Sequence, residues 1–391
     1  MVRTKLILFG ITGDLSTRKL LPALGHILDS GECDLQVIGV SRREVNVAEL
    51  LQASTARDDL ADYFSIFTMD LARADDYVRL KDAVALQEDE QALIYLSVPP
   101  SAAADIVDLL GQAGLNTPQV KLLFEKPFGF DLTSAHDFLE RTARYYDEAQ
   151  LYRIDHYAAK DIAQEVVRRH LDGETSHRRV EAVTIMAAEE IGVEGRAGFY
   201  EQTGALRDFV QGHLMQLLAI VLMHAPDEFD VNNLSHYRLQ ALTLVKPADP
   251  LTSVRAQYNG YTEEVHNPGS QTETFASLFL ESTDPRWEGV PLRLVTGKAL
   301  DKKRSLIQVK YEEGPDVTLE DGTIPVDGRP LDAYERVLID AINGDKMVFT
   351  TGPEVIRAWE IIQPVQTAWE NDDVPLKHYV QGSTIESVEA I

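Results

Sequence analysis

The chain has 391 residues, 44% of them hydrophobic and 26% charged, which is an ordinary globular composition with enough length for two domains. Its formal net charge of −26 disfavours binding to nucleic acid or to an anionic membrane, because phosphate groups require a basic face. No uncharged apolar run approaches the roughly 20 residues that cross a bilayer, so we expect a cytoplasmic protein. The single cysteine, Cys33, excludes an internal disulfide and a multi-cysteine metal site, and no metal is expected.

The first predicted strand, residues 5–11, runs into a glycine turn with the sequence Gly10-Ile11-Thr12-Gly13-Asp14-Leu15. Asp14 or Ser16 could cap the helix that follows. A strand, a glycine turn and a helix N-terminus together can bind a pyrophosphate through backbone N–H groups. By spacing alone, the Gly-x-x-Gly pattern is equally consistent with a tight turn that has no ligand.

The second predicted strand, residues 35–40, ends at Ser41-Arg42-Arg43. Folds specific for NAD place an acidic residue at this position, on the ribose hydroxyls, whereas arginines suit a 2′-phosphate. The sequence therefore favours NADP over NAD, although NAD remains possible. The alternative is a solvated pair of charges at the end of a strand.

Apolar strands at residues 64–71, 92–98 and 120–124 alternate with helices at 77–86 and 102–115. This alternation predicts a doubly wound parallel sheet with right-handed crossovers, in a dinucleotide-binding Rossmann domain over residues 1–150. Ligands bind at the carboxyl ends of such strands, where Ser97 and Pro99 lie at the end of one strand and Lys126 follows another. The Lys126–Pro127 bond is a candidate cis peptide.

The segment after the next apolar strand, residues 151–154, places Asp155, His156, Tyr157 and Lys160 within six residues. His156 and Lys160 share one face of the helical pattern that begins here. Such a cluster costs stability in a core and is useful in a ligand site. A later helix at 203–223 carries His213 on an apolar face, where a lone histidine is usually a core residue.

Strand patterns at residues 179–190, 253–258, 274–280, 291–295 and 305–309 follow, and the last four have no helices between them. Consecutive strands of this kind predict an antiparallel sheet. Two helices, at 331–342 and 355–369, complete the pattern. We therefore expect residues 151–391 to form an α+β substrate-binding and catalytic domain with a largely antiparallel sheet.

Several short motifs follow one another along most of the chain. They are Gly10-Ile11-Thr12-Gly13-Asp14-Leu15, Glu125-Lys126-Pro127-Phe128-Gly129, Arg153-Ile154-Asp155-His156-Tyr157 with Lys160, Gly204-Ala205-Leu206, His213-Leu214-Met215-Gln216, Pro285-Arg286-Trp287-Glu288-Gly289 and Gly297-Lys298-Ala299-Leu300. Together they resemble the glucose-6-phosphate dehydrogenase family, collinearly from residue 5 to about residue 310 and again at residues 333–336. The resemblance implies an active site between the two domains.

The resemblance implies oxidation of glucose 6-phosphate at C1 to 6-phosphogluconolactone, with hydride transfer to NADP, in the oxidative pentose phosphate pathway. By position, His213 resembles the general base and Asp155 the carboxylate that orients it; imidazole has a suitable pKa for this proton transfer. The remaining matches are phosphate ligands (His156, Tyr157, Lys160), sugar and phosphate contacts (Lys126, Lys298), a sugar-hydroxyl contact (Glu189), a further sugar contact (Glu201) and cofactor contacts (Gly10, Thr12, Gly13, Asp14, Leu15, Arg42, Ser97, Pro99, Lys126).

The sequence departs from the family pattern at four places. Gly212 stands where the family usually has Asn, Ala158-Ala159 replaces Leu-Gly, and Glu201 stands where Asp is usual. The missing length falls largely between Tyr311 and Pro330, in the sheet that carries the family's dimer interface and, in some members, an additional structural NADP. We expect a homodimer or higher homo-oligomer without the additional NADP. The alternatives are a dehydrogenase of another sugar or sugar phosphate, and a non-catalytic paralogue that binds sugar phosphate or nucleotide.

Overall fold

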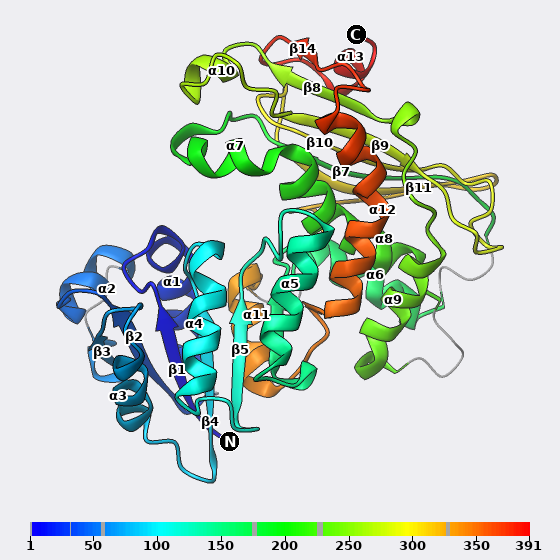
Figure 1. Ribbon diagram of the computed structural model, residues 1–391. Coiled ribbons are helices and arrows are strands. Elements are labelled where there is room, and N and C mark those ends of the chain that lie inside the picture. The colour runs from blue at the N-terminus through cyan, green and yellow to red at the C-terminus, as the bar shows by residue number, and fades with distance from the viewer. Residues whose placement is uncertain (1, 32, 56–58, 174–177, 225–229, 326–328) are drawn as a thin grey trace. The chain divides into compact units, whose positions relative to one another are not determined.

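The computed structural model describes residues 2–31, 33–55, 59–173, 178–224, 230–325 and 329–391 (Figure 1). The chain forms two compact units, each built on its own seven-stranded sheet. The first unit comprises Met1–Phe128, His136–Ala159 and Pro330–Gly352. The second comprises Gly129–Ala135, Lys160–Arg329 and Pro353–Ile391.

These units do not coincide with a single division after residue 150. The first sheet recruits two later strands, β6 (Leu151–Ile154) and β13 (Phe349–Thr350), which pair antiparallel through Phe349 and Ile154. The pattern of hydrophobic residues did not indicate β13, because a strand of two residues is too short to show alternation. Segments 151–159 and 330–352 therefore belong to the first unit.

The first sheet has the strand order β13-β6-β5-β4-β1-β2-β3. Its other strands are β1 (Arg3–Phe9), β2 (Leu35–Ser41), β3 (Phe64–Thr68), β4 (Glu90–Leu96) and β5 (Val120–Phe124). All neighbours except β13 pair in parallel, which confirms the predicted doubly wound sheet. The order reverses at β1, so the carboxyl ends of β1, β2 and β4 meet at the switch point where such sheets bind ligands.

Helices cover both faces of this sheet. They are η1 (Ser16–Leu20), α1 (Leu21–Ser30), α2 (Val47–Thr55), η2 (Ala61–Tyr63), α3 (Ala74–Val84), α4 (Pro100–Gln112), α5 (Leu132–Ala143, which begins in the second unit), η3 (Glu148–Gln150) and α11 (Ala333–Asn343). Apolar residues of α1 and α11, including Leu24 and Val337, share one core with Leu6 and Leu8 of β1. Helices α3 and α4 lie beside each other on the strands in Figure 1.

The second sheet has the strand order β12-β11-β7-β10-β9-β8-β14. Its strands are β7 (Val180–Ala188), β8 (Val254–Tyr258), β9 (Phe275–Leu280), β10 (Leu292–Gly297), β11 (Arg304–Tyr311), β12 (Val317–Glu320) and β14 (Lys377–Tyr379). The pairings are antiparallel except β7 with β10 and β8 with β14, so the prediction of a largely antiparallel sheet is confirmed. The parallel pair β7 and β10 brings two carboxyl strand ends together.

The helices of the second unit include one long apolar segment. They are α6 (Asp161–Leu171), η4 (Glu194–Arg196), α7 (Ala197–Ala205), η5 (Leu206–Leu214), α8 (Met215–Leu222), η6 (Val231–Asn233), α9 (Leu234–Leu244), η7 (Pro250–Thr252), α10 (Tyr261–Glu264), α12 (Gly352–Glu370) and α13 (Ile385–Glu389). The helix expected at 203–223 breaks at Gly204, whose φ of 63° is left-handed, and continues as the π-helix η5 before α8. Glu273 accepts a hydrogen bond from the Leu206 N–H (2.8 Å) at this break.

One helical stretch, Glu194–Leu222, which includes the break at Gly204, meets the length and hydropathy criteria for crossing a membrane. Its most apolar window is 83% buried inside the protein. Burial of this degree is typical of the core helix of a folded domain. Among the described residues no other helix meets the same length and hydropathy criteria.

Candidate active site

The glycine turn after β1 is held against the end of β4. The φ of Gly10 is 77°, and the Gly13 N–H donates a 2.8 Å hydrogen bond to the Gly10 carbonyl. A Cβ atom on Gly10 would lie 2.1 Å from the Ser97 carbonyl oxygen, so only glycine fits this position. The buried Ser16 hydroxyl donates to the Gly10 carbonyl (2.8 Å) and contacts the Ser97 hydroxyl (3.3 Å). Ser16 therefore fixes the turn, a role that the sequence reasoning missed.

The proposed helix cap was wrong. Ser16 lies inside the helical segment, and the Asp14 carboxylate instead forms an exposed ion pair with Arg18 at 2.8 Å. Neither residue caps the helix that follows the glycine turn, and this helix begins just after the carboxyl end of β1.

A cavity of about 780 Å³ opens at this switch point in the first unit. It is lined by Gly10, Thr12, Gly13, Val40, Ser41, Arg42, Arg43, Leu71, Ser97, Val98, Pro99 and Ala102. The predicted cofactor residues Gly10, Thr12, Gly13, Arg42, Ser97 and Pro99 are thus brought together, whereas Asp14, Leu15 and Lys126 are outside this lining set of described residues.

The cavity suits an anionic dinucleotide. Its described lining includes Arg42 and Arg43 and no acidic residue, in a chain whose net charge is −26. The 13-residue helix α4 begins beside it at Pro100, so its N-terminal N–H groups add positive potential. The glycine turn leaves room for a close backbone approach. These features together fit a nicotinamide dinucleotide that carries a 2′-phosphate.

Lys126 follows β5 next to a buried acid. The Lys126–Pro127 peptide is cis, as predicted. The Tyr95 hydroxyl donates to the Glu125 carboxylate, and burial raises the pKa of Glu125 to about 7, against the lowering effects of that hydrogen bond and of Lys126. The sequence reasoning did not select Glu125 as a site residue, although it directly precedes Lys126 in a recognised motif.

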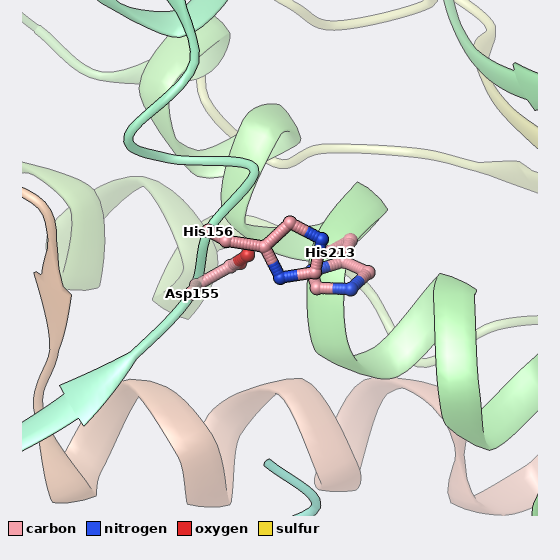
Figure 2. Close-up of side chains that lie close together, drawn as sticks. All are labelled: Asp155, His156 and His213. Atoms are coloured by element: carbon pink, nitrogen blue, oxygen red, sulfur yellow. The ribbon is translucent and has the colours of Figure 1, made fainter. Parts of the chain in front are cut away.

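Asp155 and His156 lie on the turn that follows β6, and His213 lies on η5 (Figure 2). Asp155 is only 2% exposed, and its Oδ1 accepts a 2.9 Å hydrogen bond from the Tyr157 N–H. The His156 ring stacks on Tyr334, with centroids 5.7 Å apart and an interplanar angle of 18°. The turn thus fixes a buried carboxylate and an imidazole in defined orientations.

The π-helix η5 carries His213, which is 2% exposed and meets the Phe209 ring edge-on at 5.6 Å. The Met215 N–H bonds to the Val210 carbonyl, five residues earlier, and this spacing places residues five apart on one face. Asp208 is therefore on the His213 face, and it is buried. Sequence reasoning that assumed an α-helix missed it, because five residues in an α-helix turn a side chain away.

Lys298 and Glu189 form a partly buried ion pair at the ends of the parallel strands β10 and β7. Gly297 of β10 is in register with Ala188 of β7, so the residues that follow them, Lys298 and Glu189, lie side by side. The Lys298 Nζ is 2.5 Å from a Glu189 carboxylate oxygen. Lys298 is 8% exposed, and its ammonium lies 5.1 Å from the centroid of the Tyr200 ring. The structure therefore brings together two predicted substrate contacts that are 109 residues apart in sequence.

The two other predicted contacts of the second unit have different surroundings. Lys160 precedes α6 and forms an ion pair with Asp321, at 2.8 Å. Glu201, on α7, accepts hydrogen bonds from Tyr261 (2.6 Å), Asn267 (2.7 Å) and Ser270 (2.9 Å). A carboxylate has about four acceptor positions, so Glu201 retains little capacity for a sugar hydroxyl.

Family models match both parts of the chain. The model for the NAD binding domain of glucose-6-phosphate dehydrogenase matches residues 7–165. The model for the C-terminal domain matches residues 171–327 and 323–389. The two C-terminal matches meet at residues 323–327, which places the missing family segment near this point.

Curated relatives and solved structures agree with these models. A glucose-6-phosphate 1-dehydrogenase from Gluconobacter oxydans is 31% identical over 459 aligned positions, which cover 96% of this chain and 93% of the relative. The crystal structure of glucose-6-phosphate 1-dehydrogenase from Mycobacterium avium has a TM-score of 0.86 and 29% identity, over 99% of this chain and 96% of that one. A glucose-6-phosphate dehydrogenase solved with its substrate glucose-6-phosphate also has a TM-score of 0.86, at 25% identity over 98% and 95% of the two chains. The chain belongs to the glucose-6-phosphate dehydrogenase family.

Proposed function

We propose that the protein oxidises glucose 6-phosphate at C1 to 6-phosphogluconolactone, with NADP as the hydride acceptor, in the oxidative pentose phosphate pathway. The observation that carries the proposal is the 31% identity to a glucose-6-phosphate 1-dehydrogenase over 96% of the chain. The cavity beside Arg42 supports the choice of NADP, because its described lining offers cations and no carboxylate. A family domain for nucleotide binding matches the same part of the chain.

The first unit holds the cofactor in this proposal. Gly10 and Gly13 allow the pyrophosphate to approach the backbone, Ser97 and Pro99 line the same cavity, and Arg42 binds the 2′-phosphate. When bound, NADP supplies the acceptor for the hydride from C1. Lys126 lies on the neighbouring strand end, where we assign it to cofactor and substrate contacts.

The proton is removed by His213 in this proposal. As the C1 hydride departs, the C1 hydroxyl loses its proton to the neutral imidazole, and the C1–O bond becomes the carbonyl of the lactone. Asp155 orients the ring and stabilises the imidazolium, which requires the two side chains to be within hydrogen-bond reach in the working enzyme. The near-complete burial of both His213 and Asp155 supports these roles, because a dry site strengthens their interaction.

In this proposal the substrate is contacted by both positively and negatively charged side chains. His156, Tyr157 and Lys160 bind the phosphate, and Lys298, Glu189 and Asp208 contact the sugar, whereas the Glu201 carboxylate is already occupied by three protein donors. The partly buried Lys298–Glu189 ion pair supports this assignment, since a cation and a carboxylate side by side can donate to and accept from neighbouring hydroxyl groups.

We also propose a cytoplasmic homodimer or higher homo-oligomer, on the basis of the family resemblance. Light scattering coupled to size-exclusion chromatography of the purified full chain measures its mass in solution. A mass at or above twice 43.6 kDa supports the proposal, and a mass of 43.6 kDa contradicts it.

The catalytic assignment is tested by His213→Asn. Asn retains a polar side chain but cannot accept the proton, so kcat is expected to fall by about 10²- to 10⁴-fold. The KM for glucose 6-phosphate should change little, because the phosphate and sugar contacts remain. The matched control is His236→Asn, at an exposed histidine of α9. Near-wild-type kcat in His213→Asn would remove His213 as the base.

A further inference from the structure

Lys160 has a carboxylate partner that comes from a distant part of the chain. Its Nζ lies 2.8 Å from Oδ2 of Asp321, on the turn after β12. The Lys160 side chain is 20% exposed and that of Asp321 is 37% exposed. The Asp321 N–H donates to the Ser305 carbonyl (2.9 Å) on β11, so the turn that presents the carboxylate is tied to the sheet.

The present inference rests on the proposed function, in which Lys160 binds the phosphate of the substrate. A sugar phosphate reaches Lys160 as an anion and needs the same ammonium group that Asp321 contacts. A phosphate and a carboxylate at one ammonium repel each other, so binding of one weakens binding of the other. The ion pair must therefore open, or share the ammonium at a cost, before the phosphate binds.

The turn that carries Asp321 lies where this chain departs from its family. The two matches of the C-terminal family model meet at residues 323–327, two residues beyond Asp321. The short strand β12 ends at Glu320, which pairs with Arg304 of β11 through two hydrogen bonds of 2.8 and 3.0 Å. Strands β11 and β12 thus form an antiparallel hairpin, and the turn after β12 places a carboxylate beside Lys160.

We propose that Asp321 is an internal counter-ion that competes with the substrate's phosphate for Lys160 and lowers the preference of the site for phosphorylated sugars. In this role Asp321 determines specificity without touching the reacting carbon. It weakens the binding of glucose 6-phosphate and leaves the binding of free glucose, which lacks the phosphate, nearly unchanged.

The test is Asp321→Asn, assayed with glucose 6-phosphate and with glucose. The exchange keeps the shape of the side chain and removes its charge. The KM for glucose 6-phosphate and its dissociation constant by calorimetry are both expected to fall by about fivefold, as for a partly exposed ion pair. The KM for glucose should stay constant. Asp316→Asn is the matched control, because it removes an equal charge at the other end of β12, where Asp316 is exposed.

A double-mutant cycle identifies the partner. In a Lys160→Gln background, Asp321→Asn should no longer tighten glucose 6-phosphate, because the shared ammonium is gone. An unchanged or raised KM in Asp321→Asn overturns the proposal, and so does an equal gain in Asp316→Asn. If the wild-type protein does not oxidise glucose 6-phosphate at all, the proposed function fails; calorimetric titration of inorganic phosphate into wild type and Asp321→Asn then decides the counter-ion role separately.

Discussion

Arg42 and Arg43 show that the charge of a local site can be opposite to the net charge of the whole chain. The protein carries a formal charge of −26, yet the described residues that line the cavity at the switch point of the first sheet include these two arginines and no carboxylate. Exposed charges more than about 8–10 Å away are largely screened at physiological salt. The cavity can therefore bind an anionic cofactor although the protein as a whole repels anions.

Arg42→Ala tests the 2′-phosphate contact. The KM for NADP is expected to rise by about tenfold or more, and the KM for NAD by less than about twofold, because only NADP has this phosphate. Steady-state kinetics with both cofactors measure the ratio. Arg179→Ala, at an exposed arginine of the other unit that pairs with Glu312, serves as the control. Equal effects of Arg42→Ala on both cofactors would refute the assignment.

Residue type alone identified part of the lining of the cavity in the first unit. Gly10, Arg42 and Ser97 could be chosen because a strand end followed by glycine, arginine or serine has a defined meaning in a parallel sheet. Ser16 and Glu125 could not be chosen in this way, because their roles depend on which group lies opposite them in the folded chain. Ser16 donates to the Gly10 carbonyl, and Glu125 accepts from the Tyr95 hydroxyl. The partner of Lys160 was equally hidden, since Asp321 is 161 residues away in sequence.

The element that sequence reasoning described least well is the helix that carries His213. Hydrophobic spacing predicted one α-helix over residues 203–223, but the segment breaks at Gly204 and winds as a π-helix from Leu206 to Leu214. Apolar periodicity does not distinguish an α-turn from a π-turn over so few residues. The strands were easier, because buried parallel strands are continuous apolar runs: β5 was predicted with its observed bounds, Val120–Phe124.

A buried histidine of α6, His170, contacts the backbone of α8. His170 is 5% exposed, and its Nε2 is 2.9 Å from the Ile220 carbonyl oxygen. Burial lowers the pKa of His170 to about 4, helped by the charges of Arg286 and His224. Between about pH 4 and pH 6.5 the unfolded chain therefore binds a proton that the folded chain does not, so stability falls as the pH is lowered through this range.

His170→Gln is expected to remove this dependence while keeping a side-chain donor for the Ile220 carbonyl. The wild-type protein should lose about 2 kcal/mol more unfolding free energy between pH 7 and pH 5 than the variant, as the linkage relation gives for this pKa shift. Urea titrations at both pH values measure it. The exposed His378→Gln should behave as wild type. The same pH slope in His170→Gln and wild type would show that His170 is not the group responsible.

At the scale of the whole molecule, two sheets could be predicted and the limits of the units could not. The alternation of strands and helices over the first 124 residues and the consecutive strands later in the chain indicated one parallel and one largely antiparallel sheet. The first unit, however, also takes in Pro330–Gly352, because β13 pairs with β6 and α11 packs on α1. Long-range pairings of this kind leave no local pattern in the sequence.

The central claim is that this molecule oxidises glucose 6-phosphate with NADP, and steady-state reduction of the nicotinamide measures it directly. The purified full chain is assayed with glucose 6-phosphate, free glucose and the 6-phosphates of other hexoses, with NADP and NAD in parallel. We predict the highest kcat/KM for glucose 6-phosphate with NADP, and 6-phosphogluconolactone as the product. A higher kcat/KM for another sugar would contradict the claim in favour of a related dehydrogenase, and binding of both ligands without turnover would contradict it in favour of a non-catalytic paralogue.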